Sequence, residues 1–105
     1  MEVKEIKVKS LLISDYEGLD PVRVFIEDLE LGKGFITITC YGQSWACYWG
    51  SMGERTVKEF FINCNTSYLL GCIARYQNLS ESEHNYITRI IKCVQDAFKQ
   101  SEVPA

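Results

Sequence analysis

Hydrophobic and polar residues alternate along the first half of the chain. The alternation runs through residues 3–13 and again through residues 22–29, with the period of a β-strand that buries one face. Between these segments, residues 15–21 contain a glycine and an Asp-Pro pair, which favour a turn. A third alternating segment covers residues 34–49. This half of the chain is therefore predicted to form strands.

The segment 34–49 contains a candidate hairpin turn. Gly42-Gln43 places a glycine first in a two-residue loop, as a type II′ turn requires, and this turn pairs Cys40 with Trp45. One face of the hairpin is then apolar and consists of Ile36, Ile38, Cys40, Trp45, Cys47 and Trp49. The other face is mixed and consists of Phe35, Thr37, Thr39, Tyr41, Ser44, Ala46 and Tyr48. Because a slip of one residue would mix the two sets, the apolar face is predicted to be the core face.

The second half of the chain has helical periodicity. Capping boxes at Thr56-x-x-Glu59 and Ser80-x-x-Glu83 predict helix starts, and the pattern predicts helices over about 57–64, 67–76 and 81–100. The last helix carries a buried stripe made of Ile87, Ile90, Ile91, Val94 and Phe98. Strands followed by helices indicate an α+β fold, with a roughly four-stranded antiparallel sheet in the N-terminal half. Two to three helices of the C-terminal half are expected to pack on one face of that sheet.

Length and composition are those of one small domain. The chain has 105 residues, of which 47% are hydrophobic, so we expect a single α+β domain over 1–105, with a frayed tail at about 101–105. The N-terminal residues lack the continuous apolar segment of a signal peptide. No apolar stretch reaches the roughly 18 residues that a membrane span needs. We therefore expect a cytoplasmic protein that does not associate with a membrane.

Candidate catalytic and metal-ligating residues do not form a recognisable pattern. The five cysteines are odd in number and lack a C-x-x-C pair, which predicts reduced, mostly buried thiols. The single histidine, His84, is expected to be exposed at a helix start, and a zinc site would need four ligands at recognisable spacing. We expect no catalytic residues, no cofactor and no metal, and an enzyme is the least favoured class of function.

The mixed face of the hairpin is the candidate functional surface. With Phe25 from the preceding strand, the predicted interaction face consists of Phe25, Phe35, Thr37, Tyr41 and Tyr48. The helices are needed on the tryptophan face, so these aromatic side chains would be left exposed, as at a protein-binding or homodimer surface. Together with Lys7 and Lys9, the same face would alternatively suit single-stranded nucleic acid, by stacking and charge. The net charge of −3 favours protein over nucleic acid.

Residues 36–70 carry a further signal. The motifs are Ile38-Thr39-Cys40-Tyr41-Gly42, the cluster of Trp45 with Tyr48-Trp49-Gly50, Met52-Gly53, Phe60-Phe61, Cys64-Asn65 and Tyr68-Leu69. In these motifs the chain resembles a family of small proteins encoded by tailed phages and prophages of enteric bacteria. The resemblance implies an accessory phage protein made in the cytoplasm of a bacterial host, of a kind that often binds a host or phage protein. It carries no catalytic residues over to this chain.

Overall fold

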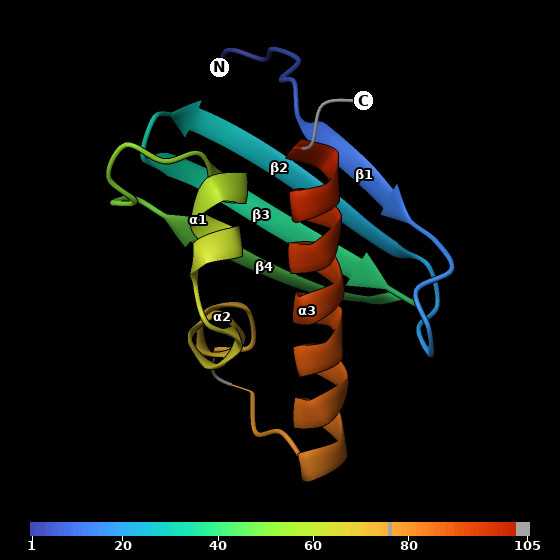
Figure 1. Cartoon of the computed structure of the whole chain (residues 1–105). Helices are drawn as coiled ribbons and strands as arrows, with labels where there is room; N and C mark the ends of the chain where they lie inside the picture. Colours follow the sequence, from blue (N-terminus) through green and yellow to red (C-terminus); the bar gives the residue numbers. More distant parts are fainter. Residues whose placement is uncertain (76, 103–105) are drawn as a thin grey trace.

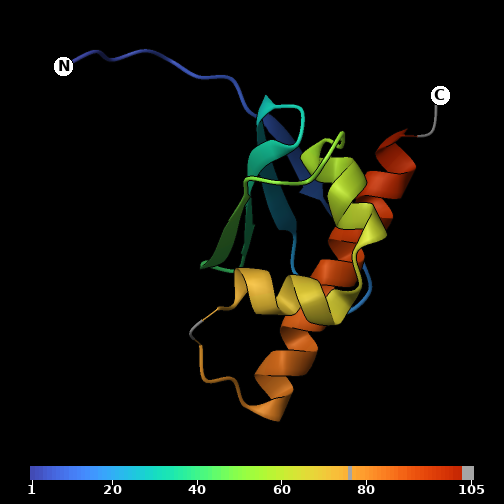
Figure 2. The ribbon, with the colours of Figure 1, turned by 90° about the vertical axis from the view of Figure 1, so that its left-hand side faces the viewer.

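The computed structural model describes residues 1–75 and 77–102 and confirms the α+β fold (Figure 1). Its strands are β1 (Lys9–Ile13), β2 (Val22–Glu30), β3 (Lys33–Cys40) and β4 (Gln43–Trp49). They form one antiparallel sheet in the order β1-β2-β3-β4. The helices α1 (Val57–Asn63), α2 (Thr66–Ile73) and α3 (Glu81–Glu102) follow. Figure 1 shows the helices in front of the sheet, and the side view in Figure 2 shows that they cover one face of it and leave the other face bare.

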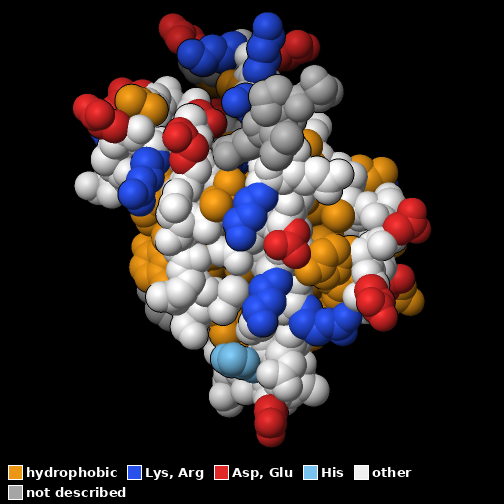
Figure 3. Space-filling view, in the orientation of Figure 1, with side chains coloured by type: hydrophobic (Ala, Val, Ile, Leu, Met, Phe, Trp, Pro, Cys, Tyr) orange, Lys and Arg blue, Asp and Glu red, His pale blue; other side chains and the backbone are white. Residues whose placement is uncertain are grey.

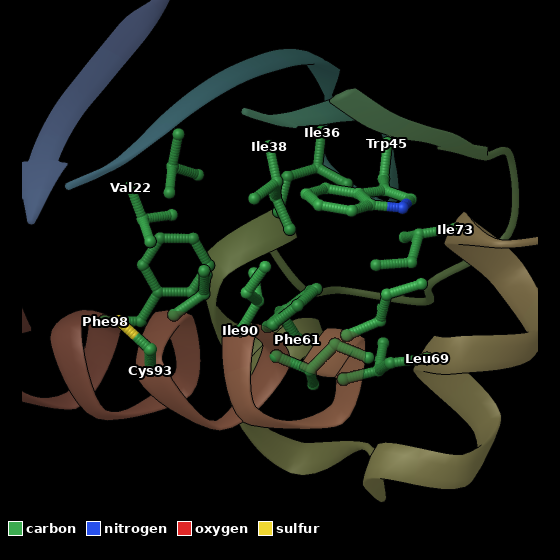
Figure 4. Close-up of a cluster of buried hydrophobic side chains, with 14 of the residues drawn as sticks. Val22, Ile36, Ile38, Trp45, Phe61, Leu69, Ile73, Ile90, Cys93 and Phe98 are labelled. Carbon is green, nitrogen blue, oxygen red and sulfur yellow. The ribbon is translucent and has the colours of Figure 1, made fainter. Parts of the chain in front are cut away.

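The hydrophobic core lies between the sheet and the helices. The sheet contributes Val22, Val24, Ile26, Ile36, Ile38, Cys40, Trp45 and Trp49, all buried. The helices contribute Val57, Phe61, Leu69, Leu70, Ile73, Ile87, Ile90, Ile91, Cys93, Val94 and Phe98, also buried. In the close-up, the Trp45 indole lies between the sheet and Ile73, and Phe61 points toward the same space (Figure 4). The predicted apolar face of the hairpin is thus the core face.

Both predicted capping boxes are present. The Thr56 hydroxyl accepts a hydrogen bond from the Glu59 backbone N–H at 3.2 Å, and the Glu59 carboxylate accepts one from the Thr56 backbone N–H at 3.0 Å. Ser80 and Glu83 form the same pair of bonds at the start of α3. These bonds favour the charged carboxylates and lower the pKa of Glu59 and of Glu83. Each box satisfies N–H groups that a helix start leaves unpaired.

The hairpin turn differs from the prediction by one residue. The two-residue loop is Tyr41-Gly42, with φ of 51° and 78°, and Cys40 pairs with Gln43. Positive φ at both loop positions is the signature of a type I′ turn, so the predicted type II′ turn at Gly42-Gln43 is wrong. Each residue of β3 therefore has a partner two positions away from the predicted one. A shift of two positions keeps the paired side chains of β3 and β4 on their predicted faces, because side chains alternate with a period of two. Tyr41, which was predicted for the mixed face, lies in the turn instead.

The ends of the chain also differ from the prediction. The first strand covers only Lys9–Ile13, and residues 1–8 precede it without pairing to the sheet. At the other end, α3 continues to Glu102, and the Ser101 hydroxyl donates a hydrogen bond to the Phe98 carbonyl at 3.1 Å. Residues 101 and 102 are therefore helical and do not belong to a frayed tail, and residues 103–105 lie outside the described residues. The predicted end of the second helix, residue 76, lies outside them too.

Two side chains join elements that are far apart in the sequence. The Gln95 side-chain amide on α3 donates to the carbonyls of Phe61 and Cys64, at 3.0 and 2.8 Å, where α1 ends. The Asp28 carboxylate on β2 accepts from the Val57 backbone N–H at 2.9 Å, where α1 begins. Both ends of this short helix are thus anchored to neighbouring elements. These contacts stabilise it, because a helix of seven residues would not be stable by itself.

Candidate functional site

The bare face of the sheet is the candidate site, and we call it the open face. Strand pairing assigns eleven residues to it, in three rows that run across the sheet. The first row is Glu27, Phe35 and Tyr48; the middle row is Ser10, Phe25, Thr37 and Ala46; the third row is Leu12, Arg23, Thr39 and Ser44. No helix of the described chain covers this face (Figure 2).

Four of the five predicted interaction residues share the open face. Phe35 and Tyr48 are neighbours on β3 and β4, with ring centroids 4.8 Å apart, and 42% and 49% of their surfaces are exposed. Phe25 and Thr37 pair directly across β2 and β3, and both are half-buried. Tyr41 does not join them, because it lies in the hairpin turn, where 81% of its surface is exposed.

The lysines predicted for this face are not on it. Lys9 pairs with Ile26 and so belongs to the row that faces the helices, and Lys7 precedes the strand. The cause lies in the sequence Leu11-Leu12-Ile13. Three apolar residues in a row do not show whether the odd-numbered or the even-numbered side chains of the strand face the core. Leu11 pairs with the core residue Val24 and therefore faces the helices, which places Leu12 on the open face.

Seven residues of the open face were not predicted as site residues, and three of them add charge or a large apolar side chain to it. Arg23 and Glu27 flank Phe25 on β2, and Leu12 lies beside Arg23 on β1. The signal for the two charged residues was available, because positions 23, 25 and 27 share one face of any strand. Among the eleven positions they are the only charged side chains, so the face carries one positive and one negative charge.

Two shallow hollows lie on the open face, on either side of Phe25. One has a volume of about 220 Å³ and is lined by Val8, Phe25, Glu27, Phe35 and Thr37. The other has a volume of about 280 Å³ and is lined by Ser10, Leu11, Leu12, Arg23 and Phe25. Both are open, and both are smaller than the roughly 300–1,000 Å³ of a typical small-molecule site. The relief of this face suits protruding side chains of another surface better than a small ligand.

The helix side of the molecule has a different surface. Acidic and basic side chains are distributed over it, with hydrophobic groups between them (Figure 3). Tyr68 on α2 is 47% exposed there, and its ring contacts Phe60 with centroids 6.2 Å apart. The mixture of charges and isolated apolar groups is typical of a solvated helix surface.

A second cluster lies where the edge of β4 meets α2. A hollow of about 410 Å³ is lined by Ala46, Cys47, Tyr48, Cys72, Ile73 and Arg75. Burial, together with the neighbouring Cys72 thiol, raises the pKa of Cys47 to about 11. Burial also raises the pKa of Cys64 nearby. A nucleophilic cysteine needs a lowered pKa, so these raised values favour the protonated, weakly reactive form of Cys47 and Cys64.

The remaining cysteines belong to the core. The Tyr86 hydroxyl donates to the Cys40 sulfur at 3.4 Å, and this bond, with burial, raises the pKa of Tyr86 to about 12. Burial raises the pKa of Cys93 to about 11. The Trp49 indole nitrogen is buried and faces Tyr68 without a hydrogen bond of good geometry among the described residues. These groups act as packing residues.

Other candidate chemistry is scattered. His84 is exposed in the first turn of α3. Within residues 1–75 and 77–102, no group of three or more His, Cys, Asp or Glu side chains is arranged to hold a metal ion. In the same part of the chain, none of the helices has the length and apolar character needed to cross a bilayer.

Comparison with known proteins gives one finding. A protein-family profile described as "Phage family" matches residues 1–103, which is nearly the whole chain. Neither the curated proteins nor the solved structures include a significant match. The family match is in agreement with the resemblance that residues 36–70 carry.

Proposed function

The chain belongs to this phage family and is a phage accessory protein, and we propose that it acts without catalysis, by binding protein through its open face. The proposal includes action in the cytoplasm of the bacterial host. It treats the helices and the core as the support that holds the face in position, and the open face as the working surface.

The observation that carries the proposal is the exposed aromatic pair. Phe35 and Tyr48 contact each other on the bare side of the sheet, and Phe25 adds apolar surface diagonally across from Phe35. Leu12 adds apolar surface at the opposite corner of the open face. Burying the rings against another protein would remove apolar area from water at about 25 cal/mol per Å². Aromatic residues are enriched at protein interfaces because they bury a large area with few rotatable bonds.

The charge of the open face supports protein as the ligand. Its charged side chains are Arg23 and Glu27, so its formal charge is zero. Binding of single-stranded nucleic acid relies on several cations along the backbone of the ligand. One arginine, with a glutamate on the same strand, does not provide several cations in a row. Lys7 and Lys9, the cations predicted for the nucleic-acid alternative, do not lie on the open face.

A pair of variants tests the proposal. The chain is tagged and used to capture proteins from a lysogenic host, and mass spectrometry identifies what is bound. We expect a specific protein to be captured by the wild type and lost with Phe35→Ser/Tyr48→Ser. The substitutions are at exposed positions, so the circular dichroism spectrum and the melting temperature should remain close to those of the wild type.

Tyr68→Ser is the matched control. Tyr68 is a tyrosine of nearly the same exposure as Tyr48, on the helix side of the molecule, and its substitution should leave capture unchanged. Capture that survives the double substitution would contradict the proposal. Tight binding of a single-stranded oligonucleotide that weakens steeply with salt would instead favour the nucleic-acid function.

A further inference from the structure

We infer that the open face binds a second copy of this chain, sheet against sheet, about a two-fold axis that runs along its middle row. The inference rests on the proposed function, since it names the protein that covers the same face. It follows from the arrangement of the three rows, which is complementary to itself.

The middle row contains one large side chain and three small ones. Phe25 lies beside Ser10 on one side and Thr37 on the other, and Ala46 completes the row. The outer rows differ from each other in size and charge. One carries the aromatic pair Phe35–Tyr48 and an acid; the other carries Thr39, Ser44 and a base.

A two-fold axis along the middle row places each outer row opposite the other outer row of the second copy. The facing pairs are then Glu27 with Arg23, Phe35 with Thr39, and Tyr48 with Ser44, each formed twice. On the edge strand β1, Leu12 lies opposite the N-terminal end of β1 in the second copy. Val8 lies at that end and lines the hollow beside Glu27. In the outer rows, the rings of Phe35 and Tyr48 meet small hydroxyl side chains and opposite charges meet. In the middle row each residue faces its own copy, so Phe25 packs against Phe25 on the axis.

The alternative axis, parallel to the strands between β2 and β3, gives a poorer match. It places Arg23 opposite Thr39 and Glu27 opposite Phe35, because these residues are neighbours across β2 and β3. Both charges would then be covered without an opposite charge, which is costly. Both axes keep the strands of facing sheets aligned, as sheet packing requires, so the charges decide between them.

Arg23 and Glu27 are available for pairing between copies. Among the described residues, the ion pair that the structure forms is Lys33 with Glu30, at 3.1 Å, and neither Arg23 nor Glu27 takes part in it. Facing sheets lie about 10 Å apart, a gap that two long side chains can span from opposite sides. The two symmetry-related pairs would fix the alignment of the strands.

The size of the face predicts a reversible dimer. Four strands about 4.8 Å apart, with about seven residues each at 3.3 Å per residue, outline about 450 Å² on each copy. The two copies together contribute about 900 Å², which is below the roughly 1,200 Å² of stable specific interfaces and in the range of weak, transient ones. We therefore expect dissociation in the micromolar range.

Charge reversal with sedimentation equilibrium tests the inference on the purified chain. The wild type should change from its monomer mass of 12.1 kDa to twice that value as its concentration rises. Arg23→Glu and Glu27→Arg should each weaken dimerisation by about tenfold or more, because each sets like charges opposite one another twice. The double variant Arg23→Glu/Glu27→Arg restores opposite charges and should return the dissociation constant to within about threefold of the wild type.

Lys92→Glu is the control for Arg23→Glu, because it makes the same charge change at an exposed position of α3 and should leave dimerisation unchanged. A wild type that stays monomeric at several hundred micromolar would overturn the inference. A double variant as weak as the single variants would overturn the strand alignment, and with it the inference. If the wild type is monomeric but host-protein capture still depends on Phe35 and Tyr48, the proposed function stands and only the second copy as partner is rejected.

Discussion

The two faces of the sheet use aromatic residues in opposite ways. On the covered face, Trp45 and Trp49 are 4% and 7% exposed and pack under the helices. On the open face, Phe35 and Tyr48 come from the same hairpin and remain 42% and 49% exposed. Residue type does not distinguish the two sets. The two sets differ in the face of the sheet to which their strand positions point. The helices cover only one of these faces.

The covered face is also more highly connected. Trp49 lies 5.2 Å from Phe60 and 6.4 Å from Phe61 between ring centroids, and Phe61 lies 5.5 Å from Phe98 on α3. This chain of contacts joins β4, α1 and α3. The ring contact of the open-face pair joins β3 to β4 alone, two strands that are already paired along their length. Stability is therefore expected to depend on one face and binding on the other.

The largest expected effect is on stability, when an aromatic side chain of either face is truncated to alanine. Trp45→Ala removes a buried indole that contacts Tyr86 edge to face at 6.3 Å, and should lower the free energy of unfolding by about 3–5 kcal/mol. Tyr48→Ala, at an exposed position, should cost less than about 1 kcal/mol. Urea denaturation followed by fluorescence measures both. Equal losses from the two variants would show that the open face carries fold stability as well.

A smaller effect concerns the close approach of α1 to the covered face. A Cβ at Gly34 would lie 2.6 Å from the Glu27 carbonyl oxygen and 2.6 Å from the Val57 side chain. Gly34→Ala should therefore destabilise the protein by about 1–3 kcal/mol through overpacking. Gly71→Ala is the control, because that helical glycine has open space around it and should gain about 0.5–1 kcal/mol. Thermal unfolding of both variants gives the signs, and a stable Gly34→Ala variant would mean that α1 is loosely packed.

The third prediction is a loss of stability at high pH. Burial holds the pKa of Cys93 at about 11, above its ordinary value of 9.0, so the folded state retains the thiol proton more strongly than the unfolded state. The stabilisation is complete below about pH 9 and is lost as the pH rises through about 11. Thermal unfolding from pH 8 to 11 should show a falling melting temperature. The fall should be shallower in Cys93→Ala, and an identical slope would remove Cys93 as a cause.

The smallest expected effect is a difference in labelling rate among the thiols. Cys40 and Cys93 are 1% and 0% exposed and should react with a thiol reagent at neutral pH only after denaturant is added. Cys47, Cys64 and Cys72 are half-buried and should react slowly in the folded protein. Mass spectrometry of timed samples assigns each site. Rapid stoichiometric labelling of one cysteine would instead indicate an activated nucleophile.

The sequence by itself determined the class of fold, the core face and the helix starts. The capping boxes at Thr56 and Ser80 are local, because each is closed by a residue three positions away. The faces of the hairpin were predictable for a similar reason. A period of two survives a turn displaced by one residue, since the partners then shift by two positions and the paired side chains of the strands keep their faces.

Only the tertiary structure decided the turn, the parity of β1 and the composition of the open face. Tyr41 takes a positive φ because the β3–β4 ladder and its buried face over-determine the turn, which local preference would not select. Leu11, Leu12 and Ile13 are alike in hydrophobicity, so pairing with β2 had to choose which of them faces the helices. As a result, Lys9 does not lie on the open face, and Arg23 and Glu27 are the charged side chains of that face. When the hydrophobic pattern of a strand does not specify which side chains face the core, pairing with the neighbouring strand does.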